Sequence, residues 1–450
     1  MQTRDNATKE EKLHQLSAWE KEIHWKEVKP DLHNDWFHQR NEDFKRLIPI
    51  YEKEGKKFEQ KANSIFTAMS AGLKTGSDPW LYNFSKKELL KNIATITSFY
   101  DKERKRWEES GKPRDVKDFV KRDETKIHWT RELLNRLVRN QKIEGANQVF
   151  IRTALYRPFV KANLYYDPNL IEMTYQIPRL FPIGKENKCI LISEGNSTFD
   201  ALITDIMPDL HVLNPSDQIL PLYWYGEGKK GSLLNGGGEE RHSAISLKVL
   251  DLFKNVYKDP SISPKDIFYY VYGILNSEEY REKWKNDFIH NLPHIPLSRN
   301  FEEFKRIGKA LGELHINYES ADPYSGAKVI CEGEDLGSVK KMHWDKKNPG
   351  TLHISDKLSI TNIPQGVNLW RIGKKSPIEW WLNPCPKLVA NSKKVGIVNN
   401  PYALGARYIK DLVLRLITVS LESQKLINSL PEIDEVESVD YKQIWKDMTL

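Results

Sequence analysis

The chain has 450 residues, of which 39% are apolar, and its 13 Trp, 19 Tyr and 16 Phe can supply a sizeable core. This composition excludes a wholly disordered protein and allows two or three domains of roughly 100 to 200 residues each. Lys and Arg outnumber Asp and Glu by 69 to 62, which gives a formal net charge of +7. Such a mild excess permits a nucleic-acid partner but does not require one.

Cysteine usage and hydropathy favour a cytoplasmic protein. The three cysteines, Cys189, Cys331 and Cys385, lie far apart in the chain. This spacing is typical of a reducing compartment and disfavours both a disulfide framework and a structural metal site. The charged N-terminus has no apolar signal core, and no later window approaches about 18 uninterrupted apolar residues. We therefore expect neither secretion nor a membrane segment.

Helices are expected at two places in the first hundred residues. One charged helix is predicted from Lys9 to Lys26. A second is predicted from Lys86 to about Trp107, because Ser85 can cap its first turn and Glu88 follows three residues later.

The segment from Asp101 to Lys142 is dense in charge. Within it, Leu133, Leu137 and Val138 fall on one helical face while arginines project elsewhere. We interpret this pattern as a solvated amphipathic helix in a connector. Contact with the DNA backbone is the alternative.

The stretch from Ala154 to Gly226 alternates short aromatic and β-branched runs with Pro, Asn-Pro and Gly-rich breaks. That pattern is typical of several short strands joined by turns. A loop rich in glycine, with paired lysines, follows from Gly226 to Arg241 but lacks the GxxxxGK[ST] spacing of a phosphate-binding loop. We interpret it as an exposed surface loop, with DNA contact as the alternative.

The clearest helix begins at Ser263-Pro264, a capping serine followed by proline at the first helical position, and is predicted to run on to Trp284. Its tyrosines, Tyr269, Tyr270 and Tyr272, are interpreted as core residues. A base-stacking platform is the alternative. A second helix is predicted from about Asn300 to Tyr318.

A basic, turn-rich region extends from Asp322 to Pro401, with strand-like runs at 327–331, 351–354 and 358–360. Basic residues interleaved with tryptophans on its loops suit phosphate and base contacts, although ordinary surface lysines would look the same. A last helix is predicted from Gly405 to Leu430, and the acidic tail at 431–440 is expected to fray.

The candidate DNA-binding residues therefore come from two regions, the Gly226–Arg241 loop and the basic loops after Lys340. They are Lys229, Lys230, Asn235, Arg241, Lys340, Lys341, Trp344, Lys346, Lys347, Arg371, Lys374, Lys375, Lys393 and Lys394.

No catalytic motif is found along the chain. Walker A, GxSxG and HExxH sequences are missing, and no PD-(D/E)xK arrangement stands out. Asp78-Pro79-Trp80 and Asn400-Pro401-Tyr402 each lack the second proline of the base-gripping [DNS]PP[YFW] motif of amino-methyltransferases, and both are interpreted as turns. We predict no catalytic residue, no cofactor and no metal site.

Several blocks of the chain resemble one known family, the C-terminal target-recognition region of Type ISP restriction-modification enzymes. They occur in order and cover most of the chain: NDWFHQRNEDFKRLIPI (34–50), GLKTGSDPWLYNFS (72–85), IHWTRELLNRL (127–137), ALYRPFVKANLYYD (154–167), PLYWY (221–225), FYYVYGILNSEEYREKW (268–284), LPHIPL (292–297) and GKALGELHINYE (308–319).

This resemblance implies a role in sequence-specific binding of double-stranded DNA for phage defence. In that family one long polypeptide carries a nuclease, a helicase-like ATPase, an adenine N6-methyltransferase and then this specificity region. The resemblance places Met1 near the end of such a methyltransferase, so the chain is similar to an excised C-terminal portion or a stand-alone specificity protein. Methyltransferase and helicase/nuclease modules, on the same or a separate polypeptide, are the partners that it implies.

We therefore expect an α+β protein with a mixed connector at residues 1–145 and a strand-rich target-recognition domain with helical elements at residues 146–450. We expect it to have no enzymatic activity by itself. Two alternatives are a degenerate DNA methyltransferase or nuclease fragment and a protein-interaction scaffold of a defence complex.

Overall fold

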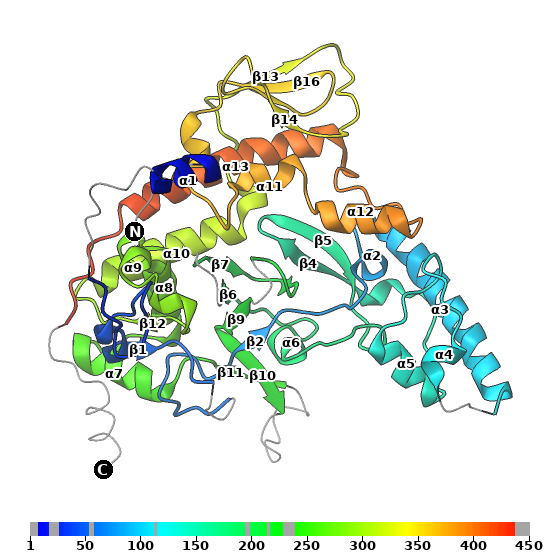
Figure 1. The fold of residues 1–450 in the computed structure, drawn as a ribbon, viewed down its shortest axis with the longest axis horizontal. Coiled ribbons are helices and arrows are strands. Elements are labelled where there is room, and N and C mark those ends of the chain that lie inside the picture. The colour runs from blue at the N-terminus through cyan, green and yellow to red at the C-terminus, as the bar shows by residue number, and fades with distance from the viewer. Residues whose placement is uncertain are drawn as a thin grey trace.

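The computed structural model of the chain describes residues 8–17, 27–53, 58–111, 115–193, 199–213, 217–227 and 239–436. Helices and sheets are mixed along the chain, which confirms the α+β prediction (Figure 1). None of the described helices is both long and apolar enough to cross a membrane.

Two four-stranded sheets lie at the centre of the molecule, as Figure 1 shows. In the first, the apolar runs of β6 (Cys189–Ile192) and β7 (Ala201–Thr204) are buried along their whole length, as expected for strands covered on both faces. The strand orders are β2 (Ser70–Ala71), β9 (Gln218–Pro221), β6, β7 in the first sheet, and β3 (Tyr82–Asn83), β5 (Val160–Tyr165), β4 (Ile151–Arg157), β8 (Met207–Pro208) in the second.

These sheets join the two halves of the chain. β2 pairs with β9, and β3 pairs with β5, so strands from residues 70–83 complete sheets whose other strands come after residue 150. The domain boundary predicted between residues 145 and 146 stays a prediction. Strands from both sides of this boundary belong to the same two sheets.

A layer of helices packs on the first sheet, because α8 (Pro264–Asn276) and α10 (Phe301–Ile316) both contact β7. The three tyrosines of α8 are buried, which confirms their interpretation as core residues. The helix predicted to run from Ser263 to Trp284 is broken, however. Ser277 has an extended backbone, and its side chain caps a separate helix, α9 (Glu278–Lys283).

The helices between residues 86 and 138 lie together at one end of the molecule (Figure 1). The predicted helix at Lys86 is α3, which ends at Glu109, and Ser85 Oγ accepts from the Glu88 amide at 3.3 Å as expected. In α5 (Arg131–Val138), Leu133 and Leu137 are buried but Val138 is 47% exposed, so the predicted apolar face is narrower than expected. The remaining elements here are α2 (Asp78–Leu81), α4 (Val116–Phe119) and the 3₁₀ helix η2 (Gln148–Phe150).

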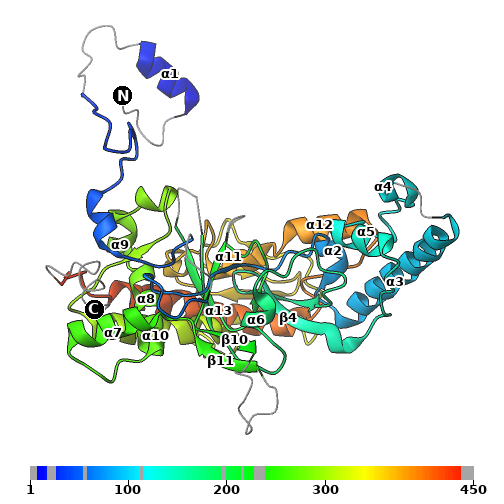
Figure 2. The ribbon, with the colours of Figure 1, turned by 90° about the horizontal axis from the view of Figure 1, so that it is seen from below.

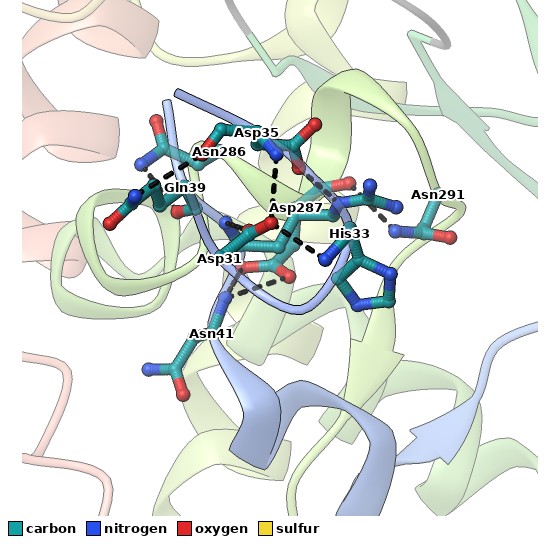
Figure 3. Close-up of polar contacts among 9 residues, drawn as sticks. Asp31, His33, Asp35, Gln39, Asn41, Asn286, Asp287 and Asn291 are labelled. Carbon is teal, nitrogen blue, oxygen red and sulfur yellow. Dashed lines mark hydrogen bonds and ion pairs between the residues drawn. The ribbon is translucent and has the colours of Figure 1, made fainter. Parts of the chain in front are cut away.

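The N-terminal segment docks against the helical layer through a braced loop (Figure 3). The Asp31 carboxylate accepts from the backbone amides of His33, Asp35 and Arg40 at 2.8 to 3.0 Å. The Asn41 amide donates to the buried Asp287 carboxylate at 3.3 Å. Strand β1 (Ile48–Pro49) then pairs with β12 (His294–Ile295). Of the helix predicted from Lys9 to Lys26, the described part is α1 (Lys9–Ser17), and residues 18–26 lie outside the described residues.

A third four-stranded sheet sits above α13 (Gly405–Asn428) at the top of Figure 1. Its order is β13 (Lys328–Cys331), β16 (Leu358–Thr361), β15 (Leu352–His353), β14 (His343–Trp344), all antiparallel, and it contains the predicted strands. The short elements after it are η5 (Gln365–Asn368), α11 (Pro377–Leu382) and α12 (Pro386–Lys394).

A two-stranded hairpin of β10 (Tyr223–Glu227) and β11 (Glu239–Ser243) lies at the opposite edge of the molecule in Figure 1. The other elements are η1 (Glu42–Arg46), α6 (Ile177–Leu180), α7 (Leu247–Tyr257), η3 (Asp287–Ile289) and η4 (Tyr318–Ser320).

The start of the acidic tail is docked, contrary to the prediction that it frays. Asp434 pairs with Arg299 at 2.6 Å, and Glu435 pairs with Lys283 at 2.8 Å. Residues 437–450 lie outside the described residues.

Candidate nucleic-acid interface

The densest group of candidate residues surrounds β14 in the third sheet. Lys340 and Lys341 precede this two-residue strand, and Lys346 and Lys347 follow it. All four side chains are exposed, and none forms an ion pair with any residue that the structure describes. Unpaired, exposed cations are available to contact phosphates, because no neighbouring carboxylate neutralises them.

The turn that carries Lys346 and Lys347 is held by one aspartate. Asp345 accepts from the Lys347 amide at 2.8 Å, from the Asn348 amide at 3.1 Å and from the Asn348 side chain at 3.0 Å. These hydrogen bonds lower the pKa of Asp345, and the bond from the Asn348 side chain has the largest effect. The carboxylate is therefore ionised. The turn therefore presents its lysines from a fixed backbone.

Trp344 occupies a different face from its neighbour His343. It pairs across the strand with the buried Leu352 and packs against the hydrophobic core. His343 is exposed on the opposite face of the sheet, because successive residues of a strand point to opposite sides. Stacking of Trp344 on a DNA base stays a prediction. His343, rather than Trp344, lies on the exposed face of the sheet.

The second group of candidates lies in the turn before α11. Arg371 donates to the carbonyl oxygens of Asn368 at 3.0 Å and Lys374 at 2.8 Å, so its guanidinium braces this turn. The Lys375 ammonium lies 4.8 Å from the centre of the Trp380 ring. Lys374 is exposed. Of the three basic residues in this group, Lys374 is therefore the one whose charged side chain is most available to contact a phosphate.

The third group, Lys393 and Lys394, ends α12 and is exposed. Lys394 lines a cavity of about 440 Å³, together with Lys74, Glu124, His128 and His211. The cavity lies between α12 and the segment around α2. Its mixed charges do not by themselves select a ligand.

Two aspartates line the same cavity, and both belong to a polar cluster. Asp209 is buried and pairs with Arg157 at 3.0 Å, while Asp78 accepts from the Tyr156 hydroxyl at 2.8 Å. Burial, and then the nearby charge of Asp78, raise the pKa of Asp209 to about 7. The cluster joins α2 to β4, and we interpret it as a structural joint.

Two Pro-containing sequences, Asp78-Pro79-Trp80 and Asn400-Pro401-Tyr402, are interpreted as turns in the sequence. The first instead begins the one-turn helix α2, at Asp78. In the second, Asn400 directly precedes a turn, as predicted.

The remaining candidates belong to the β10–β11 hairpin. Lys229, Lys230 and Asn235 lie outside the described residues. Arg241 is exposed on β11, with its guanidinium carbon 4.6 Å from the centre of the Tyr223 ring. The hairpin and the third sheet lie at opposite edges of the molecule (Figure 1), so the structure does not bring these two regions together.

Three polar residues that the sequence did not single out join the first group. His343, His353 and Ser359 lie on adjacent strands at paired positions of the third sheet. Strands β14 and β15 have two residues each, so only the strand pairing reveals that these side chains share a face. Among the described residues, no three His, Cys, Asp or Glu side chains gather in a way that could hold a metal ion.

Comparison with known proteins gives one family and several solved structures. The family model of the Type ISP C-terminal specificity domain matches residues 64–412. No curated protein sequence matches the chain.

Two of the similar structures are of Type ISP enzymes. A nuclease-deletion mutant of the Type ISP restriction-modification enzyme LlaGI, in complex with a DNA substrate mimic, is 31% identical over 92% of this chain, with a TM-score of 0.76. The ATP-dependent Type ISP restriction-modification enzyme LlaBIII, bound to DNA, is 30% identical over 91% of this chain, with a TM-score of 0.75.

A third similar structure is a DrdV–DNA complex, which is 27% identical over 95% of this chain, with a TM-score of 0.76. The chain spans 31%, 26% and 42% of the LlaGI, LlaBIII and DrdV chains, respectively. It therefore corresponds to less than half the length of each.

Proposed function

Because the chain belongs to the family of Type ISP C-terminal specificity domains, we propose that it binds double-stranded DNA and reads a short base sequence. The observation that carries this proposal is the similarity over nearly the whole chain to three structures of proteins bound to DNA or to a DNA substrate mimic. In such a role the chain directs adenine methylation and cleavage, which modules outside this sequence perform.

The proposed mechanism separates anchoring from reading. Lys340, Lys341, Lys346 and Lys347 anchor phosphates on one side of the third sheet, with Lys374, Lys375, Lys393 and Lys394 as further candidates for this role. Phosphate contacts position a protein on DNA but carry no sequence information, which must come from base edges or from DNA shape. The rigid turn at Asp345 supports this arrangement, because anchors on a fixed backbone lose less conformational freedom on binding.

The partners proposed for the chain are a methyltransferase and a helicase/nuclease. The family is described as C-terminal, and the similar chains are between about two and four times as long as the part matched. Catalysis is accordingly assigned to those modules, and this chain supplies recognition.

Selection from a pool of randomised duplexes at two salt concentrations, about 50 mM and 200 mM, tests this function. We expect one short motif to be enriched and the affinity to fall steeply with salt. A steep fall without enrichment would mean backbone binding only. No binding at either salt concentration would overturn the proposal and favour a protein-interaction scaffold.

The enzymatic alternative has its own test. A degenerate methyltransferase would bind S-adenosylmethionine and a nuclease would bind magnesium, so calorimetric titration of the chain with each ligand distinguishes them from a recognition module. We expect no heat of binding above dilution for either ligand.

A further inference from the structure

The outer face of the third sheet carries mainly polar side chains on paired strands. His343 pairs with His353, His353 pairs with Ser359, and Ser359 pairs with Ile330, so these four side chains share one face. Thr361 and Lys328 continue the same face two residues further along β16 and β13. The opposite face carries Leu352, Leu358 and Ile360, which are buried.

His353 is fixed within this row by two hydrogen bonds. Its Nε2 lies 3.2 Å from Asp345 Oδ2, and its Nδ1 lies 2.8 Å from Ser359 Oγ. An ionised carboxylate can only accept, so Nε2 donates to Asp345, while Nδ1 and the Ser359 hydroxyl form the second hydrogen bond. Both ring nitrogens of His353 are therefore occupied, and its ring orientation is set by the sheet.

His343 stacks on this fixed ring. The two ring centres are 5.0 Å apart with an angle of 25° between the planes. His343 itself forms no hydrogen bond or ion pair with any side chain in the described ranges. A neutral imidazole has one donor and one acceptor nitrogen, and both are free on an oriented, exposed ring.

The surroundings of His343 favour nucleic acid over another ligand. The unpaired lysine pairs 340–341 and 346–347 flank it on both sides along the chain, and the nearest carboxylate on its face, Asp345, is engaged by His353 and the turn. Ile330, 46% exposed on the same face, adds an apolar group of the kind that contacts a thymine methyl.

We propose that His343 contacts a base edge in the major groove and that His353 is the residue that positions it, while the four flanking lysines hold the phosphates. This inference rests on the proposed function and adds to it the residues that read the sequence. Asp345 has a double role here, because it holds both the lysine-bearing turn and the ring of His353.

The test compares the wild-type chain with His343→Ala, His353→Gln and the control His290→Ala in selection from the randomised duplex pool. His290 is exposed and directly follows η3, outside the third sheet. We expect His343→Ala to relax the preference at one base position and to weaken binding of the preferred site by about 5- to 30-fold. Binding of an unrelated duplex should not change.

His353→Gln should relax the preference at the same base position as His343→Ala, because it frees the stacked ring. A merely structural role for His353 would instead weaken binding of all duplexes equally. Equal thermal unfolding midpoints for the variants and the wild type would show that the fold is intact.

The outcomes separate this inference from the proposed function. If the wild-type chain enriches a motif and His343→Ala enriches the same motif with unchanged affinity, the inference is wrong and the proposed function stands. If the wild-type chain enriches no motif, both are wrong.

Discussion

His315 is held as a neutral imidazole inside the helical layer. Its Nδ1 lies 2.6 Å from the Tyr272 hydroxyl, its Nε2 lies 2.9 Å from Ser423 Oγ, and its ring stacks on Trp370 with the centres 4.5 Å apart. Burial, assisted by the charge of Arg281, lowers the pKa of His315 to about 3. The residue therefore joins α8, α10 and α13 without a charge.

We expect this histidine to make folding sensitive to acid. The unfolded chain binds a proton at His315 near pH 6.5, whereas the folded chain does not until about pH 3. The free energy of unfolding should therefore fall as the pH drops below 6.5, by up to about 1.4 kcal/mol per pH unit from this residue. Between pH 6.5 and 5 this amounts to about 2 kcal/mol.

Urea unfolding of the wild type and His315→Gln at pH 7.5, 6.5, 5.5 and 5.0 measures this contribution. His315→Gln should be less stable at pH 7.5 but should lose less stability on acidification. His290→Gln is the matched control, because its side chain is exposed. Parallel pH dependence in the wild type and His315→Gln would contradict the assignment.

The crossing of α8 and α10 depends on two glycines. A Cβ atom at Gly308 would lie 2.1 Å from the Tyr269 carbonyl oxygen, and one at Gly273 would lie 2.4 Å from the Phe304 carbonyl oxygen. The two backbones therefore approach more closely than any other residue type would allow. This close approach brings the tyrosine-rich face of α8 onto α10.

Gly308→Ala should separate these helices and lower the free energy of unfolding by about 2 kcal/mol or more, because the obstructing atoms belong to the backbone of α8. Gly312→Ala is the matched control on the same helix. Its Cβ would meet the Tyr269 ring at 3.1 Å and the end of Ile203 at 3.3 Å, which are side chains that can shift.

Chemical denaturation of both variants tests this difference. Alanine favours a helix over glycine by about 1 kcal/mol, so Gly312→Ala should be near neutral. Equal destabilisation by the two substitutions would show that helix approach is not limited by Gly308.

The break between α8 and α9 shows where the helical pattern was misleading. Apolar residues continue past Asn276 at helical spacing, so the sequence favours one helix to Trp284. Ser277 instead caps α9 by accepting from the Tyr280 amide at 3.3 Å, and Arg281 Nε donates to the Leu275 carbonyl at the end of α8 at 2.7 Å. These side-chain bonds satisfy backbone groups that a continuous helix would have paired.

Two sets of candidate DNA-binding residues lie at opposite edges of the molecule in Figure 1, one in the third sheet and one in the β10–β11 hairpin, and the hairpin also lies at an edge in Figure 2. We expect the two sets to act independently, because sites with no shared partners are additive. Replacing Lys340, Lys341, Lys346 and Lys347 with Gln should make the dependence of log K on log salt shallower, by about 0.9 for each phosphate that the variant no longer neutralises. Arg241→Gln should make it shallower by the equivalent of about one further phosphate.

Binding titrations over a series of salt concentrations measure both effects, with the exposed Lys87 of α3 replaced by Gln as a control for net charge. If the slope of log K against log salt is unchanged in Arg241→Gln, the hairpin is not part of the DNA interface. If that slope is unchanged in the four-lysine variant, the third sheet is not part of the interface.

The sequence by itself determined where several of the helices begin and which family the chain belongs to. The helices at Lys86, Ser263, Asn300 and Gly405 begin where their caps or periodic residues predict, because helical patterns are local. The aromatic blocks at 154–167, 221–225 and 268–284 are mostly buried, whereas Trp36 and Phe37 of the block at 34–50 are exposed.

Only the tertiary structure decided how the sheets are assembled and which residues face outward. β1, β2, β3, β14 and β15 have two residues each, too few to show an alternating pattern, and their positions are set by distant partners such as Ile295 for Ile48. The same holds for the proposed site. The lysines around β14 could be singled out from the local pattern of basic residues around a tryptophan, but the stacking of His343 on a ring fixed by Ser359 and Asp345 follows from strand register, which no local pattern specifies.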